Sequence, residues 1–466
     1  MITINRNSKI PLYMQIYNQL KEAITNNILP ANTKILSKRK MSKHLSVSIN
    51  TIELAYSQLV SEGFIESKPK KGFFVCKIDK IINSETLNSN INYLYKNNSK
   101  NNIKIDFSIN GIDKENFPYN TIRKIIRYSI NENKNFTESS PPQGEYELRS
   151  AISSYIYISR GVKCLPQQII IGAGTDNLIQ ILSYILENTC SIAMENPVYN
   201  ESYLFFKRMG HNVISIPIDN KGIQIEPLNL LKSAVVYITP SHQFPLGITM
   251  PINRRIQLLN WANKEENRYI IEDDYDSEFR YNTKPIPALK SNDNNDKVIY
   301  LGSFSRSISP SLRISYMILP NSLLNIYNNK YKGFSCAVSK FDQIVLTNFI
   351  LNGQYESHIN KMRKLYKEKR IFLLNQLKNI FDSDIEIYGE NAGQHLLVKI
   401  NNGLSENELC SMAKKYKVNV YPISPFFINE VPKKYKSTIL LGYATLNYDE
   451  ILEGINLLKK AWINKK

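Results

Sequence analysis

The sequence has no apolar run that approaches the ~18–20 residues needed to span a membrane. Its first residues, MITINRNSKIPLY, lack the long apolar core of a signal peptide. Cysteine and histidine are scarce, at five each, and they form no C-x-x-C pair and no H-E-x-x-H motif. These absences exclude a membrane-embedded protein and argue against a disulfide scaffold or a metal site. We therefore expect a cytoplasmic protein without a membrane partner.

What the chain does have is an excess of positive charge. Across 466 residues, 59 Lys and Arg stand against 41 Asp and Glu, a net charge of +18. Residues 1–80 hold thirteen of these basic side chains and only five of the acidic ones. A basic end on a larger body favours a polyanionic partner such as nucleic acid. A generally Lys- and Asn-rich composition would give the same excess with no meaning beyond solubility, so the local pattern has to decide.

Length and composition indicate an ordinary globular protein of two or three domains, with 42% hydrophobic and 21% charged residues. Residues 82–104 are rich in Asn, Ser and Lys and hold few apolar anchors, which is typical of a linker. The expected segments are a basic domain at 1–80, a linker at 81–104, a large domain at 105–324 and a smaller lobe at 325–466.

After the linker, short apolar stretches alternate with amphipathic ones, a pattern that predicts a largely parallel sheet covered by helices. The expected strands lie at 169–171, 192–194, 213–218, 234–238, 269–271, 298–301 and 314–319. Beyond about residue 325 the pattern changes to long helices, with strands at 385–388, 395–400 and 439–443. The expected architecture is an α/β body followed by a small α+β lobe.

The basic domain has the spacing of three helices followed by a hairpin. The predicted helices cover 12–24, 38–45 and 49–62, and the hairpin strands cover 64–67 and 73–75. Ser37 and Ser48 stand where helix N-caps are expected. The last two helices fit a helix-turn-helix, in which the start of the second helix meets base edges and phosphates. Three lysines at the hairpin tip suit a wing on the phosphate backbone; a generic three-helix bundle with a solvated basic loop is the plainer alternative.

From PLYMQIYNQLKEAI to FIESKPKKGFFV, this segment resembles the winged helix-turn-helix of GntR-type transcription regulators along its whole length. It departs from their usual sequence in two places: the residues from Ile35 to Arg39 lack the proline of a Leu-Pro-Ser-x-Arg pattern, and Ile49 stands where an arginine is usual. The resemblance implies binding to double-stranded DNA. The candidate DNA contacts are Ser37, Arg39, Ser48, Asn50, Thr51, Lys68, Lys70 and Lys71.

Three segments of the body place polar side chains directly after predicted strands, where the ligands of open α/β sheets gather. These are the acidic cluster EDDYDSE at 272–278, the stretch GSFSRSISPSLR at 302–313 and the helix-opening turn GAGTD at 172–176. A carboxylate can pair with a cationic ring nitrogen, and hydroxyls, arginines and a helix N-terminus can hold a phosphate. Alone, the acidic cluster is better explained as a solvated loop, and glycine-rich turns from a strand to a helix are common without a ligand. Their occurrence in one body favours a ligand site.

Together these motifs resemble the fold type I, pyridoxal-phosphate-dependent aminotransferases from about residue 105 to the end, including MENPVY, TPSHQFPLG, IEDDYDSEF and LGSFSRSISPSLRISY. With the winged helix in front, the chain resembles a MocR-family regulator across almost its whole length. The resemblance implies that Tyr199 stacks on the pyridine ring, Asp273 pairs with the ring nitrogen and Tyr275 bonds to the 3-hydroxyl. The residues it implies for the phosphate are Ser303, Ser305, Arg313, Gly174, Thr175 and Asp176.

This sequence differs from these enzymes at positions that their catalysis requires. Where they carry the lysine that forms a Schiff base with the cofactor, this chain has Arg306, whose guanidinium stays charged and is a poor nucleophile. Leu440 stands where an arginine usually clamps the substrate carboxylate, and Glu201 stands where another arginine is often found near Tyr199. We therefore expect no catalytic residue. Arg306 is expected to touch the ligand without a covalent bond.

The sequence favours a DNA-binding transcription regulator whose aminotransferase-like domain senses a small effector and sets the geometry of a homodimer on DNA. The resemblance implies a head-to-tail dimer. The expected effector is pyridoxal 5′-phosphate held non-covalently, and another phosphate-bearing or anionic ligand stays open. Two rival functions also stay open: a working aminotransferase with a DNA-binding appendage, and a constitutive DNA-binding dimer with a vestigial pocket.

Overall fold

The computed structural model describes residues 2–78, 103–132, 136–186, 190–232, 234–281, 286–389 and 392–463. The chain divides into two compact units, Met1–Ser99 and Lys100–Lys466, each with its own apolar core. The linker predicted at 81–104 lies almost wholly outside the described residues. No helix within the described ranges is long and apolar enough to cross a membrane.

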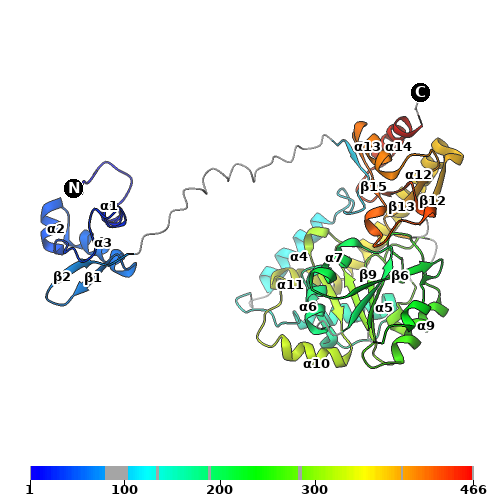
Figure 1. Ribbon diagram of the computed structural model, residues 1–466, viewed down its shortest axis with the longest axis horizontal. Helices are drawn as coiled ribbons and strands as arrows, with labels where there is room; N and C mark the ends of the chain where they lie inside the picture. Colours follow the sequence, from blue (N-terminus) through cyan, green and yellow to red (C-terminus); the bar gives the residue numbers. More distant parts are fainter. Residues whose placement is uncertain are drawn as a thin grey trace. The chain divides into compact units, whose positions relative to one another are not determined.

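The first unit has the three helices and the hairpin that its sequence predicts (Figure 1). These elements are α1 (Leu12–Thr25), α2 (Lys38–Leu45), α3 (Ile49–Ser61) and the antiparallel strands β1 (Ile65–Lys68) and β2 (Gly72–Val75). Ser37 and Ser48 cap α2 and α3, because their hydroxyls accept hydrogen bonds from the backbone N–H groups of Lys40 and Thr51. Ser46 ends α2 in the left-handed conformation and turns the chain toward α3.

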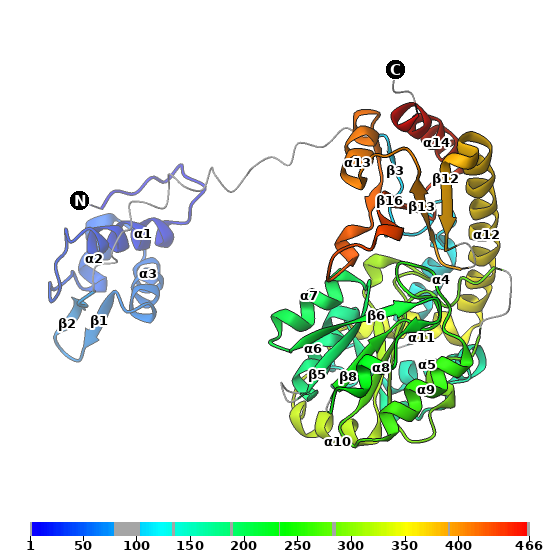
Figure 2. The same cartoon turned by 45° about the vertical axis from the view of Figure 1, so that its right-hand side comes forward.

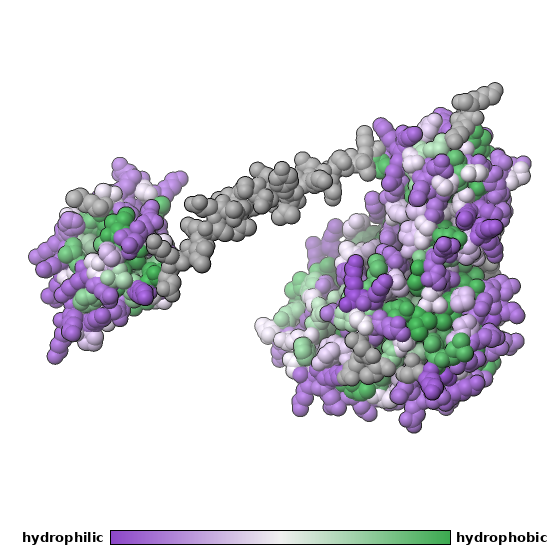
Figure 3. All heavy atoms as spheres, viewed as in Figure 1, coloured by the Kyte–Doolittle hydropathy of each residue, from purple (hydrophilic) through white to green (hydrophobic). Residues whose placement is uncertain are grey.

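The core of this unit comes from the faces that α1 and α3 turn toward each other. Ile16 and Leu20 of α1 and Ile52 and Tyr56 of α3 are at most 2% exposed. The Tyr56 hydroxyl donates to the backbone oxygen of Leu36 at 2.9 Å, which ties α3 to the chain just before α2. Hydrophilic residues cover most of the visible surface of the unit (Figure 3). An apolar interior therefore supports a polar, largely basic exterior.

An eight-stranded sheet forms the centre of the second unit, in the order β4-β11-β10-β9-β8-β5-β6-β7. Neighbours from β10 through β6 are parallel, whereas β11 runs antiparallel to both of its neighbours and β7 forms an antiparallel edge. The strands are β4 (Ile169–Gly172), β5 (Ser191–Asn196), β6 (Val213–Asp219), β7 (Gly222–Ile223), β8 (Ala234–Ile238), β9 (Tyr269–Asp274), β10 (Val298–Ser303) and β11 (Ser315–Ile318). The sheet is largely parallel, as predicted from the sequence.

Helices cover both faces of this sheet (Figure 2). Side chains alternate along each strand, so Val235 packs in the cluster with α6, α7 and α10 while Val236 packs in the cluster with α9. The helices of this part are α4 (Tyr119–Glu132), α5 (Tyr146–Arg160), α6 (Thr175–Leu186), α7 (Asn200–Arg208), α8 (Glu226–Asn229), α9 (Ile252–Asn263), α10 (Asn321–Lys330) and α11 (Lys340–Leu351). Because both faces are covered, the sequences of the central strands are continuous apolar runs.

A smaller lobe follows, with a four-stranded antiparallel sheet in the order β12-β13-β16-β15. Its elements are α12 (Gln354–Phe381), β12 (Ile385–Tyr388), β13 (His395–Ile400), α13 (Glu406–Lys415), β14 (Val418–Asn419), β15 (Tyr421–Pro422), β16 (Thr438–Gly442) and α14 (Tyr448–Trp462). β3 (Ile105–Asp106) precedes the large sheet in sequence but pairs with β14.

The expected division at residue 324 falls inside α10, and α11 packs on α4 and α5. The reason is that helices of the large part continue past the last strand of its sheet. The exact bounds of the large domain and the lobe stay a prediction.

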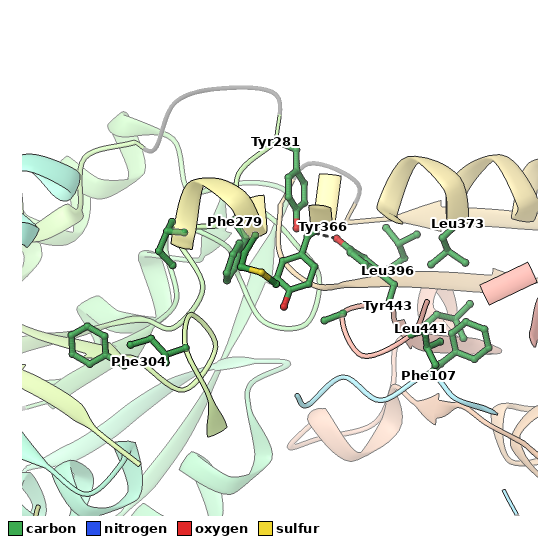
Figure 4. Packing of buried hydrophobic residues seen from close by; sticks show 14 of the residues in the cluster. Phe107, Phe279, Tyr281, Phe304, Tyr366, Leu373, Leu396, Leu441 and Tyr443 are labelled. Atoms are coloured by element: carbon green, nitrogen blue, oxygen red, sulfur yellow. Dashed lines mark hydrogen bonds between the residues drawn. The ribbon is translucent and has the colours of Figure 1, made fainter. Parts of the chain in front are cut away.

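One apolar cluster joins the large part to the lobe (Figure 4). Phe279 and Phe304 follow strands of the large sheet, Leu396 and Leu441 belong to β13 and β16, and Phe107 follows β3; all five are at most 1% exposed. Burying side chains of this size contributes roughly 1.5–3 kcal/mol each. The packing therefore holds the lobe against the large part and fixes the space between them.

Ile52→Ala should lower the free energy of unfolding of the first unit by about 2–5 kcal/mol, because it empties a fully buried position on α3. Leu54 lies on the same helix and is 57% exposed, so Leu54→Ala is the matched control and should change that free energy by less than about 0.5 kcal/mol. Scanning calorimetry measures both variants. Equal losses would contradict the assigned helix face.

Candidate functional site

The carboxyl ends of four neighbouring strands meet at one cavity. β10, β9, β8 and β5 run parallel, so their last residues lie at the same edge of the sheet. The cavity encloses about 250 Å³, near the lower end of the roughly 300–1,000 Å³ typical of small-molecule sites. It is lined by Asn110, Gly111, Thr175, Asp176, Tyr199, Ser202, Thr239, Phe244, Asp273, Tyr275, Ser303, Ser305, Arg306, Pro310 and Arg313.

Nine of the ten residues that the sequence places at the cofactor line this cavity. The tenth, Gly174, lies against Arg313: a Cβ there would come within 2.5 Å of the guanidinium, and its φ is +91°. The positive φ favours glycine at this turn, and a larger residue would displace the guanidinium of Arg313. The three sequence segments therefore come together in space, and their roles toward a ligand remain a prediction.

Asp273 lies near the end of β9 at the cavity wall. Its carboxylate accepts a hydrogen bond from the hydroxyl of Tyr237 on the neighbouring β8, and that hydroxyl lies 3.1 Å from the hydroxyl of Ser202. Burial raises the pKa of Asp273 to about 7, although the bond from Tyr237 acts in the opposite direction. A cation placed beside this carboxylate would favour its charged form. The residue is therefore suited to a positively charged ligand group.

Tyr275 also lines the cavity, and its hydroxyl belongs to a polar network. It donates to the backbone oxygen of His242 at 3.0 Å and lies 2.9 Å from Nδ1 of the same residue. That nitrogen is 2.8 Å from Oδ2 of Asp276, so Nδ1 carries its hydrogen toward the carboxylate. Burial, aided by the negative charge of Asp276, raises the pKa of Tyr275 well above its ordinary value. The phenol therefore stays protonated at neutral pH.

Hydroxyls and a guanidinium gather at the start of α6. Arg313 donates to Oδ2 of Asp176 at 3.0 Å, and the hydroxyl of Ser303 accepts from the backbone N–H of Ser305 at 3.2 Å. The first turn of α6 adds helix N–H groups and a partial positive charge. Arg313 and Asp176 are 54% and 52% exposed, so their ion pair is weak and yields readily to an anionic ligand.

Arg306 reaches the cavity from the loop after β10. Its guanidinium donates to the backbone oxygen of Ile109 and, at 3.3 Å, to Oδ1 of Asn110. Its own backbone oxygen accepts a hydrogen bond from Nε2 of Gln394 at 3.4 Å. The side chain is thus committed to two oxygens of one short stretch of chain, and its charge is permanent.

Aromatic and apolar side chains complete the wall. Tyr199 meets Phe244 edge to face, with ring centroids 5.4 Å apart, and burial raises the pKa of Tyr199 to about 12. Leu440 is fully buried in an apolar cluster with Phe244 and Leu397 and does not line the cavity. Glu201 is exposed on α7. Among the lining residues, the cations are therefore Arg306 and Arg313.

The eight candidate DNA contacts lie at the starts of α2 and α3 and on the hairpin. The hydroxyls of Ser48 and Thr51 are 2.8 Å apart and bond to each other, while Lys68 pairs with Glu66 at 2.8 Å. The candidates with exposed side chains are Ser37, Arg39, Ser48, Asn50, Lys70 and Lys71. Three of these six side chains are basic, and contact of the eight residues with DNA stays a prediction.

Known protein families match the two units of the chain separately. Residues 12–75 match the gntR family of bacterial regulatory proteins, and residues 102–455 match aminotransferase class I and II. The HTH-type transcriptional regulator YdeL of Bacillus subtilis is 41% identical over 460 residues, 98% of each chain. The probable rhizopine catabolism regulatory protein MocR of Rhizobium meliloti is 28% identical over 477 residues, 99% of this chain and 96% of that protein. This chain belongs to the MocR family of transcription regulators.

Solved structures show what the second unit of this MocR-family regulator resembles. An archaeal alanine:glyoxylate aminotransferase matches with a TM-score of 0.70 at 25% identity, over 78% of this chain and 91% of its own. The kynurenine aminotransferase of Pyrococcus horikoshii, solved in complex with PMP, matches with a TM-score of 0.69 at 26% identity, over 78% and 92%. The second unit therefore has the aminotransferase fold, whose family generally binds pyridoxal phosphate. The first unit is the DNA-binding domain of the gntR family.

The sequence did not identify several residues of the cavity in this MocR-family regulator. The motif TPSHQFPLG marks the resemblance but assigned no role to Thr239 and Phe244, which line the cavity, or to His242, which bonds to the lining residue Tyr275. Asn110 and Gly111 follow β3, and nothing local in their sequence indicates a ligand site. Their place at the cavity depends on contacts with distant parts of the chain, among them the pairing of β3 with β14 of the lobe across more than 300 residues.

Asp273→Asn should make the free energy of unfolding of the ligand-free second unit less sensitive to rising pH. The pKa of Asp273 is raised from 3.8 to about 7 on folding, so the folded state keeps a proton that the unfolded state loses between these values. The free energy of unfolding therefore falls as pH rises through this window, by up to about 1.4 kcal/mol per pH unit. The variant should lack this contribution and be more stable than the wild type at pH 8, but not at pH 4.

Urea unfolding at pH 4, 6 and 8 measures this difference. The exposed Asp449→Asn on α14 controls for the change in net charge. Parallel stability curves for the wild type and Asp273→Asn would contradict the raised pKa.

Proposed function

We propose that this MocR-family regulator binds pyridoxal 5′-phosphate as a non-covalent effector in the cavity at the ends of β9 and β10. The observation that carries the proposal is the combination of a ring-binding and a phosphate-binding set of residues with Arg306 in the position of the covalent lysine. Such a cavity suits a ligand that associates and dissociates. Reversible binding is what a sensor requires.

At the ring end, three side chains suit the ligand. When bound, pyridoxal phosphate brings a ring nitrogen that can carry a proton, a ring hydroxyl, an aldehyde and a phosphate into the cavity. Asp273 would pair with the ring nitrogen, because its desolvated carboxylate gains most from a nearby cation. Tyr199 would stack on the ring, and Tyr275, whose hydroxyl is fixed by His242, would bond to the ring hydroxyl.

At the phosphate end, the ligand would meet the first turn of α6 together with the hydroxyls of Thr175, Ser303 and Ser305. Arg313 would exchange its weak, half-exposed ion pair with Asp176 for the phosphate. Gly174 supports this arrangement by leaving space for the guanidinium. The phosphate therefore supplies a fixed anchor that does not depend on a covalent bond.

Two features argue against an aminotransferase as the alternative. The guanidinium of Arg306 cannot supply the unprotonated amine that covalent attachment needs. Leu440 lies in a packed apolar cluster where a clamp for a substrate carboxylate would be required. The other residues of the cavity are compatible with an aminotransferase. They are equally compatible with a regulator that only binds the ligand. The other alternative, a constitutive DNA-binding dimer, leaves the matched set of cavity residues without a use.

Regulation would couple this cavity to the DNA-binding domain. We expect a homodimer, arranged head-to-tail, that acts on double-stranded DNA in the cytoplasm. An effector that alters operator affinity does so through a coupling free energy, typically about 1–3 kcal/mol. The regulator PdxR of Corynebacterium glutamicum, 26% identical over 403 residues, is named for pyridoxine biosynthesis, which supports a related effector here.

Equilibrium dialysis tests the proposed ligand. The wild type should bind pyridoxal phosphate in the cavity and lose it again on dialysis, even after borohydride treatment, because no lysine is among the described residues that line the cavity. Arg313→Met should weaken binding by about 10- to 100-fold through loss of a charge-assisted bond to the phosphate. Arg208→Met, an exposed arginine on α7, is the control and should leave affinity unchanged. Absence of binding, or a borohydride-fixed adduct on a residue of the cavity in the wild type, would refute the proposal.

DNA binding should depend steeply on salt, and the wing lysines should contribute to that dependence. For every DNA phosphate that a protein cation neutralises, the slope of log K against log salt steepens by about 0.9. Lys70→Ala and Lys71→Ala should each make the slope shallower by up to this amount, whereas Lys460→Ala on α14 should not. Fluorescence anisotropy with a labelled duplex at several salt concentrations measures the slopes. A slope that is the same in all four proteins would exclude the hairpin as a DNA-binding element.

A further inference from the structure

Residues 103–113 are the first described part of the chain after the DNA-binding domain, and they are built into the smaller lobe. β3 pairs with β14, and the ring of Phe107 packs beside Leu441 (Figure 4). The amide of Gly442 at the end of β16 donates to the backbone oxygen of Phe107 at 2.9 Å. The stretch is therefore held by strands of the lobe from its beginning.

Further contacts hold the stretch after Phe107. A Cβ at Gly442 would lie 1.9 Å from the backbone oxygen of Ser108, so only glycine permits this close approach. Asp113 forms a buried ion pair with Lys369 of α12 at 2.6 Å, and its amide donates to the hydroxyl of Tyr366 at 3.0 Å. Both sides of the turn at 109–111 are thus fixed to the lobe.

Arg306 comes from the large part. It follows β10, and its guanidinium bonds to the backbone oxygen of Ile109 and to the side chain of Asn110. Asn110 and Gly111 line the cavity together with Arg306. The side chain therefore links the turn at 109–111, which belongs to the lobe, to a loop of the large sheet at the ligand cavity itself.

We propose that Arg306 is a positioning residue that fastens the turn at 109–111 to the large part and so closes the cavity by hydrogen bonds where the enzymes of this fold hold their cofactor covalently. The planar guanidinium donates to the two oxygens from two separate nitrogens in a fixed geometry, whereas all donors of a lysine ammonium lie on one nitrogen. A bound ligand leaves when these bonds open, so Arg306 governs the dissociation rate. Only this last consequence rests on the proposed function.

The competing role for Arg306 is that of a simple cation for the anionic ligand. The two roles differ in the ligand-free protein. If Arg306 closes the cavity, its side chain must bond to the turn before any ligand binds. The guanidinium is indeed bonded to two oxygens of that turn. A simple cation would leave the turn equally ordered whether or not the guanidinium is present.

Hydrogen–deuterium exchange on the full-length, ligand-free protein separates these roles. Arg306→Met, which keeps the chain length but not the donors, should speed amide exchange of residues 109–112 by about 10- to 100-fold, the factor expected for losing a charge-assisted hydrogen bond. Arg306→Gln keeps a donor amide and should give a smaller increase. The matched control is Arg313→Met, which removes the other cation of the cavity and should leave this exchange unchanged.

Stopped-flow release of pyridoxal phosphate then tests the consequence. Arg306→Met should raise the dissociation rate constant by about tenfold or more. If Arg306→Met fails to fold, Asn110→Ala removes one acceptor and leaves the arginine, and it should speed the same exchange by a smaller factor.

The outcomes distinguish the closure from the proposed effector. Unchanged exchange at 109–112 in Arg306→Met and Arg306→Gln would overturn the closure, even if the wild type binds pyridoxal phosphate. Faster exchange in these variants, together with a wild type that does not bind pyridoxal phosphate, would support the closure and refute the effector. A dissociation rate that stays unchanged while exchange rises would overturn the claim that Arg306 governs release.

Discussion

The parallel alignment of β10, β9, β8 and β5 is the constraint on which the site depends. Because these strands end at one edge of the sheet, segments far apart in the sequence meet around one cavity. A buried ion pair next to the lining residue Asp273 supports this arrangement: Arg160 of α5 bonds to Asp274 at the end of β9, at 2.7 Å, with both side chains at most 4% exposed. Tyr300 of β10 donates to the same carboxylate. Removing one member of such a pair typically costs about 3–5 kcal/mol, so the ends of β9 and β10 are held firmly in register.

A permanent cation at Arg306 changes what this scaffold can do. An amine at this place could alternate between protonated and unprotonated forms and react with an aldehyde, whereas a guanidinium can only donate hydrogen bonds and attract anions. The residues around it keep their polar networks, as Asp273 with Tyr237 and Tyr275 with His242 show. In the proposed function, the cavity therefore keeps its binding chemistry and has lost its covalent chemistry. In a chain that also carries a gntR-family DNA-binding domain, this combination suits recognition of a ligand better than its conversion.

Helix caps and apolar runs in the sequence predicted those parts of the fold that depend on interactions between residues close in the chain. The start of α2 follows from the cap at Ser37, and the strands of the large sheet follow from apolar runs that are buried on both faces. The convergence of the three motifs also follows, because it needs only a parallel sheet. The reversed direction of β11 could not be predicted in this way, since an apolar run has no direction. The contribution of Asn110 and Gly111 was missed because it arises from the pairing of β3 with β14.

Reversible control of DNA affinity by pyridoxal phosphate is the central claim, and a direct measurement can test it. Duplexes that the full-length protein selects from a random pool would serve as operator, and the dissociation constant would be measured without the ligand, with it, and again after its removal by dialysis. The account predicts that the ligand shifts the constant by about 5- to 150-fold and that dialysis restores the original value. An operator affinity that is the same in all three states, or a shift that dialysis cannot reverse, would contradict it.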